Sequence, residues 1–169
     1  MKKVVPILLP AIFIVALSCK QPKQETDGRQ EVVAVEHAKE VDAIFPQGQK
    51  GSPKTFTGNA YNYGLVMMDS TYTTLVGNVY FEPGARSNWH IHPAGQILII
   101  TDGEGFHQIE GQPKEILKKG SVVKCPPNTK HWHGASPDKG MQQLYIVPNT
   151  EKGVVEWMEA VTDEQYNGN

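Results

Sequence analysis

Four of the six histidines fall in two closely spaced pairs, His90 with His92 and His131 with His133. Side chains two residues apart point to the same face of a β-strand, so each pair presents two imidazoles side by side if its segment is extended. Neutral imidazole is a common ligand of transition metals. One such pair is weak evidence, because surface and core histidines are more frequent than ligands. Two pairs, each close to a Gly/Pro turn, favour a metal site.

Gln96 is a polar side chain at the start of an apolar segment. The Pro-Ala-Gly sequence at 93–95 predicts a bend, so strand alternation cannot be counted from His92 to Gln96. Beyond the bend both faces of the expected strand 96–100 are apolar apart from Gln96, which predicts a strand buried on both sides. A buried amide needs a polar partner, and a metal ion would supply one.

The remaining histidines and the cysteine near the second pair are expected to lie outside the site. His37 falls in a polar stretch and is expected to be solvated, and His107 is expected to point away from a hairpin. Cys125 precedes two prolines and is expected to be a packed residue rather than a ligand.

The elements that must position these residues are short strands. Runs of β-branched and aromatic residues alternate with turn signals at close spacing, which predicts an all-β fold, an antiparallel sandwich or barrel. A C-terminal helix is expected where Val154, Trp157, Met158 and Val161 recur at helical spacing. The expected strands are 65–68, 73–81, 96–101, 105–110, 121–125 and 141–147, separated by turns at 82–84, 102–103, 111–113 and 126–128.

The N-terminal segment indicates export. Residues 1–18 have a basic start and an apolar run too short to span a membrane, as in a signal peptide. The run ends at Ala16-Leu17-Ser18-Cys19, which resembles the lipobox of bacterial lipoproteins, with Ala16 where a larger aliphatic residue is usual. We expect lipidated Cys19 to anchor the protein to a bacterial membrane, in the periplasm or at the cell surface. A plain cleaved signal peptide is the alternative. Residues 19–44 are a polar spacer and 45–169 the folded domain.

Composition argues against a nucleic-acid partner. The formal net charge is -2, the hydrophobic residues make up 39% of the chain, and no basic run is present. Nucleic-acid-binding domains usually carry a basic patch. If Cys19 is lipidated, Cys125 is the one thiol left, so no internal disulfide can form and a packed core must supply the stability.

The spacing around the first histidine pair resembles the first motif of the cupin superfamily. That motif has a Gly, an HxH pair, a Glu and a second Gly at fixed intervals. Here Gly84, His90, His92 and Gly103 occupy the matching positions, and Gln96 replaces the Glu.

The spacing around the second pair resembles the second cupin motif, a Gly followed by PxG and a His. Here the positions are Gly120, Pro126, Asn128 in place of the second Gly, and His131. The resemblance implies a small jelly-roll barrel (a double-stranded β-helix) that holds one divalent metal ion. The side chains it assigns as ligands are His90, His92, Gln96 and His131.

A closer resemblance covers about residues 45–166 and is carried by the segments 81–86, 89–93, 130–135, 157–159 and 162–166. These segments are similar to the bacterial cupins that include manganese-dependent hydroxynitrile lyases, near the carboxymuconolactone-decarboxylase-associated group. The resemblance implies Mn as the ion, with Fe, Ni, Co and Zn also compatible with ligands of this type. Without a thiolate among the ligands, soft-metal chemistry is disfavoured.

The implied ligand set is electrically neutral, so a divalent ion would keep its full charge and be a strong Lewis acid. His133 shares a strand face with His131 and is the candidate general acid or base; the alternative is that it only orients a ligand or a loop. Further lining positions implied by the resemblance are Gly77, Val79, Ser87, Gln143 and Val147. The hydroxynitrile-lyase pattern has His at the position of Gln143 and Gln at that of Val147, so two polar groups of that pocket are absent here.

Three functions stay open on the sequence. The favoured one is a metal-dependent lyase of hydroxynitrile-lyase type, which would release cyanide and an aldehyde from a small cyanohydrin. The alternatives are an Fe- or Ni-dependent dioxygenase and a non-catalytic module that binds a small molecule at the cell surface. No DNA-binding domain accompanies the barrel, which argues against a transcription regulator. The strand that Gln96 opens, apolar on both faces, fits a contact between two barrels, so a homodimer is expected.

Overall fold

The structure is a computed structural model that describes residues 43–168. The signal peptide, Cys19, His37 and most of the polar spacer therefore lie outside the described residues. Within residues 43–168 no helix is long and apolar enough to cross a membrane.

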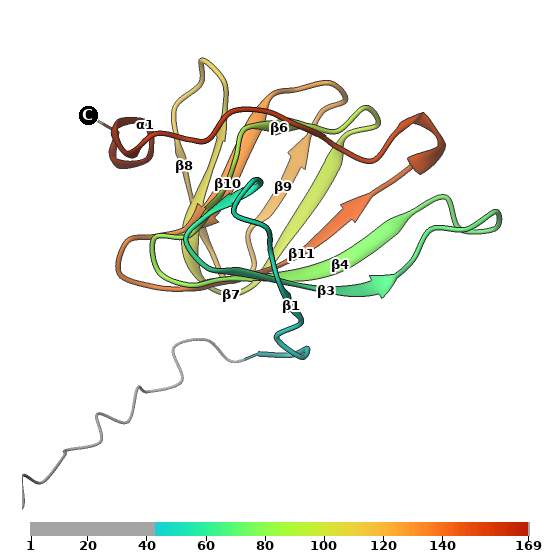
Figure 1. Ribbon diagram of the computed structural model, residues 1–169, viewed down its shortest axis with the longest axis horizontal. Helices are drawn as coiled ribbons and strands as arrows, with labels where there is room; N and C mark the ends of the chain where they lie inside the picture. Colours follow the sequence, from blue (N-terminus) through green and yellow to red (C-terminus); the bar gives the residue numbers. More distant parts are fainter. Residues whose placement is uncertain (1–42, 169) are drawn as a thin grey trace, which may run out of the picture. The chain divides into compact units, whose positions relative to one another are not determined.

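The described residues form a curled antiparallel sheet, as the alternation of short strands and turns predicted (Figure 1). Its main path runs in the order β1-β3-β4-β11-β7-β10-β5-β2, with β8 and β9 paired to β7, and with β6 paired to β10 and β12. The strands are β1 Gln49–Lys50, β2 Phe56–Thr57, β3 Ala60–Val66, β4 Leu75–Phe81, β5 Arg86–Ser87, β6 His90–Ile91, β7 Gln96–Ile109, β8 Glu115–Lys118, β9 Val122–Cys125, β10 His131–Ala135, β11 Met141–Val147 and β12 Glu156–Trp157. The other elements are the 3₁₀ turn η1 Thr150–Lys152 and the helix α1 Asp163–Asn167.

Strand β7 connects the two halves of the curled sheet. Its first half pairs with β9 and β11 and its second half with β8 and β10. The sequence predicted a turn at 102–103, which is wrong, because one continuous strand passes through Asp102 and Gly103. Gly103 has φ +81°, and a Cβ there would lie 2.0 Å from the Gly140 carbonyl oxygen, so this close approach to β11 requires glycine.

The core lies between the two halves of the sheet. Its largest fully buried apolar side chains include Phe81, Leu98, Ile100 and Met141, which come from β4, β7 and β11. On strand β7 the side chains of Leu98 and Ile100 are buried and those of Ile97 and Ile99 are half-buried. The strand is thus packed inside and partly covered outside, close to the expectation that both faces are buried.

The C-terminal segment crosses the sheet as an extended chain and not as the helix predicted at residues 154–161. Backbone hydrogen bonds join Met158 N–H to the Trp89 carbonyl (2.9 Å) and Trp89 N–H to the Glu159 carbonyl (3.0 Å), and β12 pairs with β6. These strand-type bonds use the backbone groups that a helix would need internally. Of the apolar side chains at helical spacing, only Val161 is buried in this extended segment, whereas Val154 and Met158 are half-buried and Trp157 is exposed.

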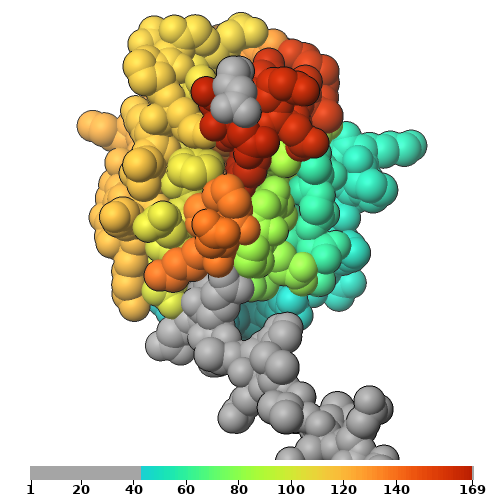
Figure 2. Space-filling model, turned by 90° about the vertical axis from the view of Figure 1, so that its left-hand side faces the viewer, coloured from blue at the N-terminus to red at the C-terminus, as the bar shows by residue number. Residues whose placement is uncertain are grey.

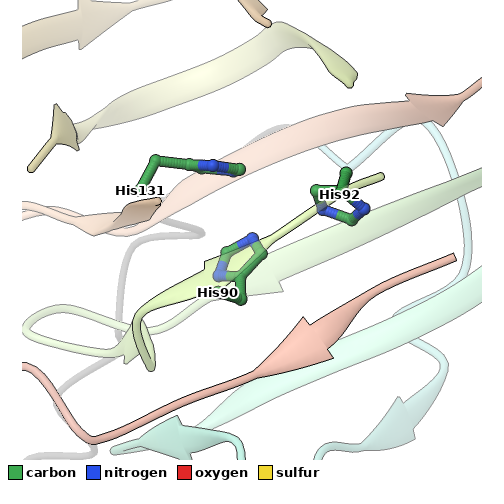
Figure 3. A group of neighbouring side chains, drawn as sticks. All are labelled: His90, His92 and His131. Carbon is green, nitrogen blue, oxygen red and sulfur yellow. The ribbon is translucent and has the colours of Figure 1, made fainter. Parts of the chain in front are cut away.

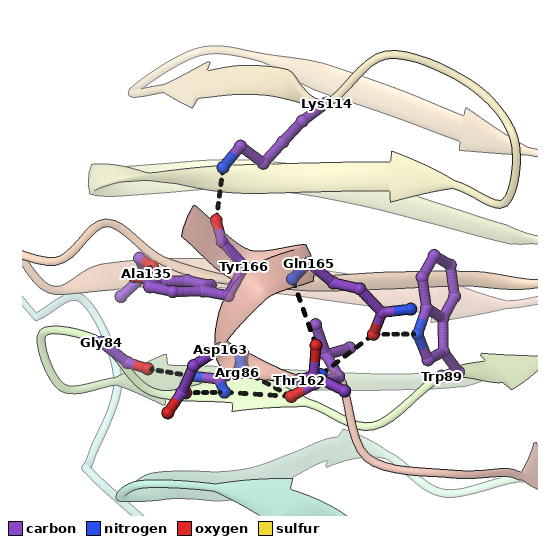
Figure 4. Close-up of polar contacts among 10 residues, drawn as sticks. Gly84, Arg86, Trp89, Lys114, Ala135, Thr162, Asp163, Gln165 and Tyr166 are labelled. Atoms are coloured by element: carbon purple, nitrogen blue, oxygen red, sulfur yellow. Dashed lines mark hydrogen bonds and ion pairs between the residues drawn. The ribbon is translucent and has the colours of Figure 1, made fainter. Parts of the chain in front are cut away.

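The helix that does form is α1, which starts at a capping box. The Thr162 side chain accepts from the Gln165 N–H, and the Gln165 side chain accepts from the Thr162 N–H. The Tyr166 hydroxyl donates to the Ala135 carbonyl at 2.7 Å, and Lys114 donates to the Tyr166 carbonyl (Figure 4). Figure 2 shows the C-terminal residues (red) on the surface beside the yellow segment that contains β8. The expected C-terminal helix is present, but later and shorter than its predicted position.

Candidate metal centre

Three histidines from two neighbouring segments meet inside the barrel (Figure 3). His90 on β6 lies directly opposite His131 on β10 in the antiparallel ladder, and His92 follows β6. One ligand atom from each lies within 4.8 Å of the other two, and all three side chains are buried. The sequence predicted this convergence, and the pairing of β6 with β10 brings it about.

A backbone carbonyl fixes the ring of each of these histidines. Nδ1 of His90 lies 2.9 Å from the carbonyl oxygen of Asn88. Nδ1 of His92 lies 2.5 Å from the carbonyl oxygen of Val154, and Nδ1 of His131 lies 3.0 Å from that of Thr129. A carbonyl only accepts, so Nδ1 carries the proton and Nε2 carries a lone pair. Nε2 of His92 is buried and has no hydrogen-bond partner. Such an orphaned acceptor fits a metal ion, and metal-ligating histidines show this same arrangement.

Gln96 joins the cluster through its amide oxygen. Oε1 lies 3.1 Å from Nε2 of His131, and the side chain is 5% exposed. Because Nδ1 of His131 donates to Thr129, Nε2 of His131 carries a lone pair and is an acceptor, as is Oε1 of Gln96. A cation between these two acceptors would satisfy both. The residues thus offer three imidazole nitrogens and one amide oxygen, all uncharged, which is a donor set suited to a divalent transition metal.

Burial keeps the imidazoles uncharged. Desolvation lowers the pKa of His90 well below 6.5, with a further contribution from His131, and it lowers the pKa of His92. Burial also lowers the pKa of His131 to about 3. Because a metal binds the deprotonated nitrogen, a site whose histidines are neutral at ordinary pH binds an ion without first losing protons.

His133 lies beside this cluster, on the same strand as His131. Its ring is 5.3 Å from that of His90 and 5.9 Å from that of His131, and its Nδ1 is 2.9 Å from the amide nitrogen of Gln143. Its backbone N–H donates to the Ser87 hydroxyl at 3.2 Å. Burial, and then the neighbouring His90, lower the pKa of His133 well below 6.5. The ring is therefore held in its neutral form.

A cavity of about 140 Å³ opens on one side of the cluster. His90, His92, Gln96 and His133 form its polar wall, and most of the rest is apolar. The apolar and other lining residues are Phe56, Asn62, Leu75, Val79, Tyr145, Val147, Val154, Val155 and Trp157. A pocket of this size and lining suits a small ligand with an apolar body and one or two polar groups.

The lining positions inferred from the sequence all lie at or next to this cavity. Val79 and Val147 line the cavity. Gln143 and Ser87 form hydrogen bonds with His133, and Gly77 lies against the ring of Tyr145, which lines the cavity. A Cβ on Gly77 would lie 2.3 Å from the Tyr145 hydroxyl oxygen, so glycine makes room for that ring.

Two residues outside the expected ligand set lie against His131, and one of them, Cys125, is a buried residue as the sequence predicted. His107 was expected to point away from a hairpin, which is wrong: its side chain is 1% exposed and its ring is 5.5 Å from that of His131. The sulfur of Cys125 lies 2.9 Å from Nδ1 of His131. Burial raises the pKa of the Cys125 thiol to about 12.

The misplacement of His107 has a structural reason. The inward positions of β7 are Gln96, Leu98 and Ile100 in its first half, and Gly103, Gly105 and His107 in its second half. A register shift opposite Gln142 and Gln143 moves the inward face by one residue. Reading 102–103 as a turn hid this, although the small residues that alternate with His107 were a usable signal. Cys125 pairs with Gln96 across β9 and β7 and so shares its face.

Comparisons with known proteins indicate the family to which this fold belongs. The model of the cupin domain family matches residues 77–147. The chain is 44% identical over 117 residues to an (R)-mandelonitrile lyase of Granulicella tundricola, covering 69% of this chain and 89% of that protein.

Solved structures show the same fold. A cupin-like protein from Thermotoga maritima is 50% identical, with a TM-score of 0.72 over 75% of this chain and 96% of that one. A DMSP lyase from Ruegeria pomeroyi is 23% identical, with a TM-score of 0.52 over 62% of this chain and 52% of that one, and shows likeness of fold alone.

Proposed function

The chain belongs to the cupin superfamily, close to its hydroxynitrile-lyase-like members, and we propose that it is a metal-dependent lyase that splits a small cyanohydrin into an aldehyde and hydrogen cyanide. The observation that carries the proposal is the set of buried, neutral donors on one wall of a small apolar cavity. The (R)-mandelonitrile lyase relative supports the reaction class, since it shares 44% of its aligned residues with this chain.

The proposed ligands are His90, His92, Gln96 and His131, and Mn²⁺ is the proposed ion. When bound, the ion supplies Lewis acidity for an oxygen-bearing substrate, undiminished by any charged ligand. The carbonyls of Asn88, Val154 and Thr129 accept from Nδ1 of the three histidines. These hydrogen bonds leave the lone pair on each Nε2 free to bind the ion.

His133 is the proposed proton carrier. In the reaction the hydroxyl proton leaves, the bond between the carbinol carbon and the nitrile carbon breaks with its electron pair going to cyanide, and cyanide takes up a proton. The net transfer is one proton from oxygen to cyanide. His133 lines the cavity, and burial keeps its ring in the neutral form that can act as a base. Because the lowered pKa disfavours the protonated ring, His133 passes the proton on to cyanide readily.

Gln143 controls which nitrogen of His133 is available. In the structure the Gln143 amide nitrogen faces Nδ1 at 2.9 Å, and its amide oxygen is buried without a partner. Turning the amide would let the oxygen accept from a protonated Nδ1, leaving a lone pair on Nε2 to act as the base. The hydroxynitrile-lyase pattern that the sequence resembles has a histidine at this position, so Gln143 is expected to slow the reaction or alter the substrate preference.

The test is the release of benzaldehyde from mandelonitrile by Mn²⁺-loaded protein, with metal-free protein as the reference. His133→Ala is expected to keep its Mn²⁺ and to lose roughly 100-fold or more of the rate, as for removal of a general acid or base. His90→Ala is expected to lose both the ion and the activity. Gln112→Ala, at an exposed turn position, is the control and should behave as wild type.

Two outcomes would refute the lyase. Binding of mandelonitrile by calorimetry without benzaldehyde above the metal-free level would indicate a non-catalytic binding module. Oxygen consumption by Fe²⁺-loaded protein with an aromatic substrate, in the absence of cyanide release, would indicate a dioxygenase.

A further inference from the structure

A second group of donors shares His131 with the candidate ligands, and none of its three members is among the residues lining the cavity. One ligand atom from each of His107, Cys125 and His131 lies within 4.8 Å of the other two. Their exposed fractions are 1%, 4% and 0%. The group is thus fully enclosed, and its three side chains come from β7, β9 and β10.

We propose that His107, Cys125 and His131 form a second, thiophilic metal site for an ion such as Zn²⁺ or Cu⁺, and that filling it withdraws His131 from the first site. The proposal rests on the positions of these side chains and not on the lyase reaction.

His107 is oriented as a ligand. Its Nδ1 lies 3.4 Å from a carboxylate oxygen of Glu115, while its Nε2 is buried without a hydrogen-bond partner. A carboxylate next to one ring nitrogen holds the proton there and leaves the lone pair on the other, as is usual behind metal-bound histidines. This orphaned nitrogen is an observation independent of the cysteine.

Cys125 and His131 supply the other donors. The Cys125 sulfur is 2.9 Å from Nδ1 of His131, and the Thr129 carbonyl oxygen lies 3.0 Å from that nitrogen and 3.8 Å from the sulfur. When an ion binds, the thiol releases its proton to solvent and a sulfur–metal bond forms. A thiolate with two imidazoles selects Zn²⁺ or Cu⁺ over Mn²⁺, since soft ligands favour soft ions.

The two sites compete because a neutral imidazole carries one proton. With Nδ1 bound to the second ion, the proton of His131 sits on Nε2, which lies 3.1 Å from Oε1 of Gln96. Nε2 then donates to that oxygen, and both His131 and Gln96 are satisfied without the first ion. The thiophilic ion thereby disables the first site without entering the cavity.

The test uses Cd²⁺ as a thiophilic probe of full-length protein. Adding Cd²⁺ to Mn²⁺-loaded wild type is expected to give thiolate-to-cadmium charge-transfer absorption and to release Mn²⁺. The electron paramagnetic resonance signal of free Mn²⁺ measures the release. Cys125→Ser is expected to lack the absorption and to need about tenfold more Cd²⁺ to release Mn²⁺, because the oxygen is a poor ligand for a soft ion.

His107→Gln is the second variant, and it should weaken Cd²⁺ binding while leaving the thiolate absorption visible at higher concentration. Wild type that binds Cd²⁺ without charge-transfer absorption, or Cys125→Ser that releases Mn²⁺ at the wild-type Cd²⁺ concentration, would overturn the proposal. Mn²⁺ binding by Cys125→Ser without Cd²⁺ reports on the first site alone, so failure of one site is distinguishable from failure of the other.

Discussion

The candidate ligands share one property at the scale of single residues: none of them carries charge. His90, His92 and His131 are kept neutral by burial, and Gln96 stands where the cupin motif has Glu. An ion held by such groups keeps its whole positive charge, which favours binding of anionic groups and costs affinity for the ion itself.

Gln96→Glu tests that property. A carboxylate a few ångströms from a divalent ion gains Coulomb energy, most of it offset by desolvation of the carboxylate, so we expect Mn²⁺ to bind about tenfold more tightly. The rate of mandelonitrile cleavage should fall, because the added charge weakens the Lewis acid. Calorimetric titration with Mn²⁺ and a rate assay measure the two effects.

Gln112→Glu is the matched control, since it adds the same charge at an exposed turn and should change neither quantity. Unchanged or weaker Mn²⁺ binding in Gln96→Glu would mean that Gln96 is not a ligand.

At the scale of elements, the C-terminal segment holds the site together from outside. The Val154 carbonyl fixes the ring of His92, and Trp157 on β12 lies over His90 with ring centroids 4.9 Å apart. The segment is tied to the barrel by Arg86, whose guanidinium donates to the Val161 carbonyl and to Asp163 (Figure 4). The extended path that replaced the expected helix therefore positions a ligand.

Tyr166→Phe measures a second attachment of this segment to the barrel, the hydrogen bond from the Tyr166 hydroxyl to the Ala135 carbonyl. The lost hydroxyl leaves the Ala135 carbonyl without its 2.7 Å hydrogen bond, and we expect the free energy of unfolding to fall by about 1–2 kcal/mol. Asp163→Asn is the comparison: its side chain is 82% exposed, so its ion pair with Arg86 should contribute less than about 1 kcal/mol. Guanidinium unfolding of wild type and the two variants gives both values, and equal losses would contradict the expectation that the Tyr166 hydrogen bond contributes more than the exposed ion pair.

At the scale of the whole molecule, the enclosed histidines make stability depend on pH. His92, His107 and His131 all have a pKa below 6.5 in the folded protein, with burial as the largest cause, whereas in the unfolded chain they titrate near the ordinary value. The unfolded chain therefore binds more protons than the folded one once the pH drops below about 6.5.

The metal-free protein is thus expected to lose stability as the pH falls from about 6.5 to about 3, where His131 itself takes up a proton. The slope is about 1.4 kcal/mol per pH unit for each histidine that stays neutral. Denaturant midpoints between about pH 7.5 and about pH 5 measure it, and a flat profile would contradict the burial of neutral imidazoles. With Mn²⁺ present the stability should be higher at each pH but fall with a similar slope, because the folded ligands are already neutral and protons compete with the ion only near their lowered pKa values.

The expectations about location and partners remain predictions. The signal peptide, the lipid on Cys19 and the membrane anchor concern residues outside the described part of the chain. The homodimer is likewise untested, although several exposed apolar side chains, among them Tyr63, Val66 and Met67, gather on β3 and just beyond it.

The sequence alone determined the fold family and the ligand candidates. Those conclusions rest on local periodicity and on fixed intervals between motif residues, such as the HxH spacing and the distance from His92 to Gln96, and these survive any error in strand boundaries. Strand β11 was predicted with its observed bounds, because a run of β-branched and aromatic residues between clear turns is a local signal.

Only the tertiary structure decided what surrounds the ligands. The register shift in β7 turned His107 inward, β9 placed Cys125 beside His131, and backbone pairing drew residues 156–159 into an extended path. Each of these depends on hydrogen bonds between segments far apart in the chain, whose energies outweigh local helical or turn preferences and leave no local mark in the sequence.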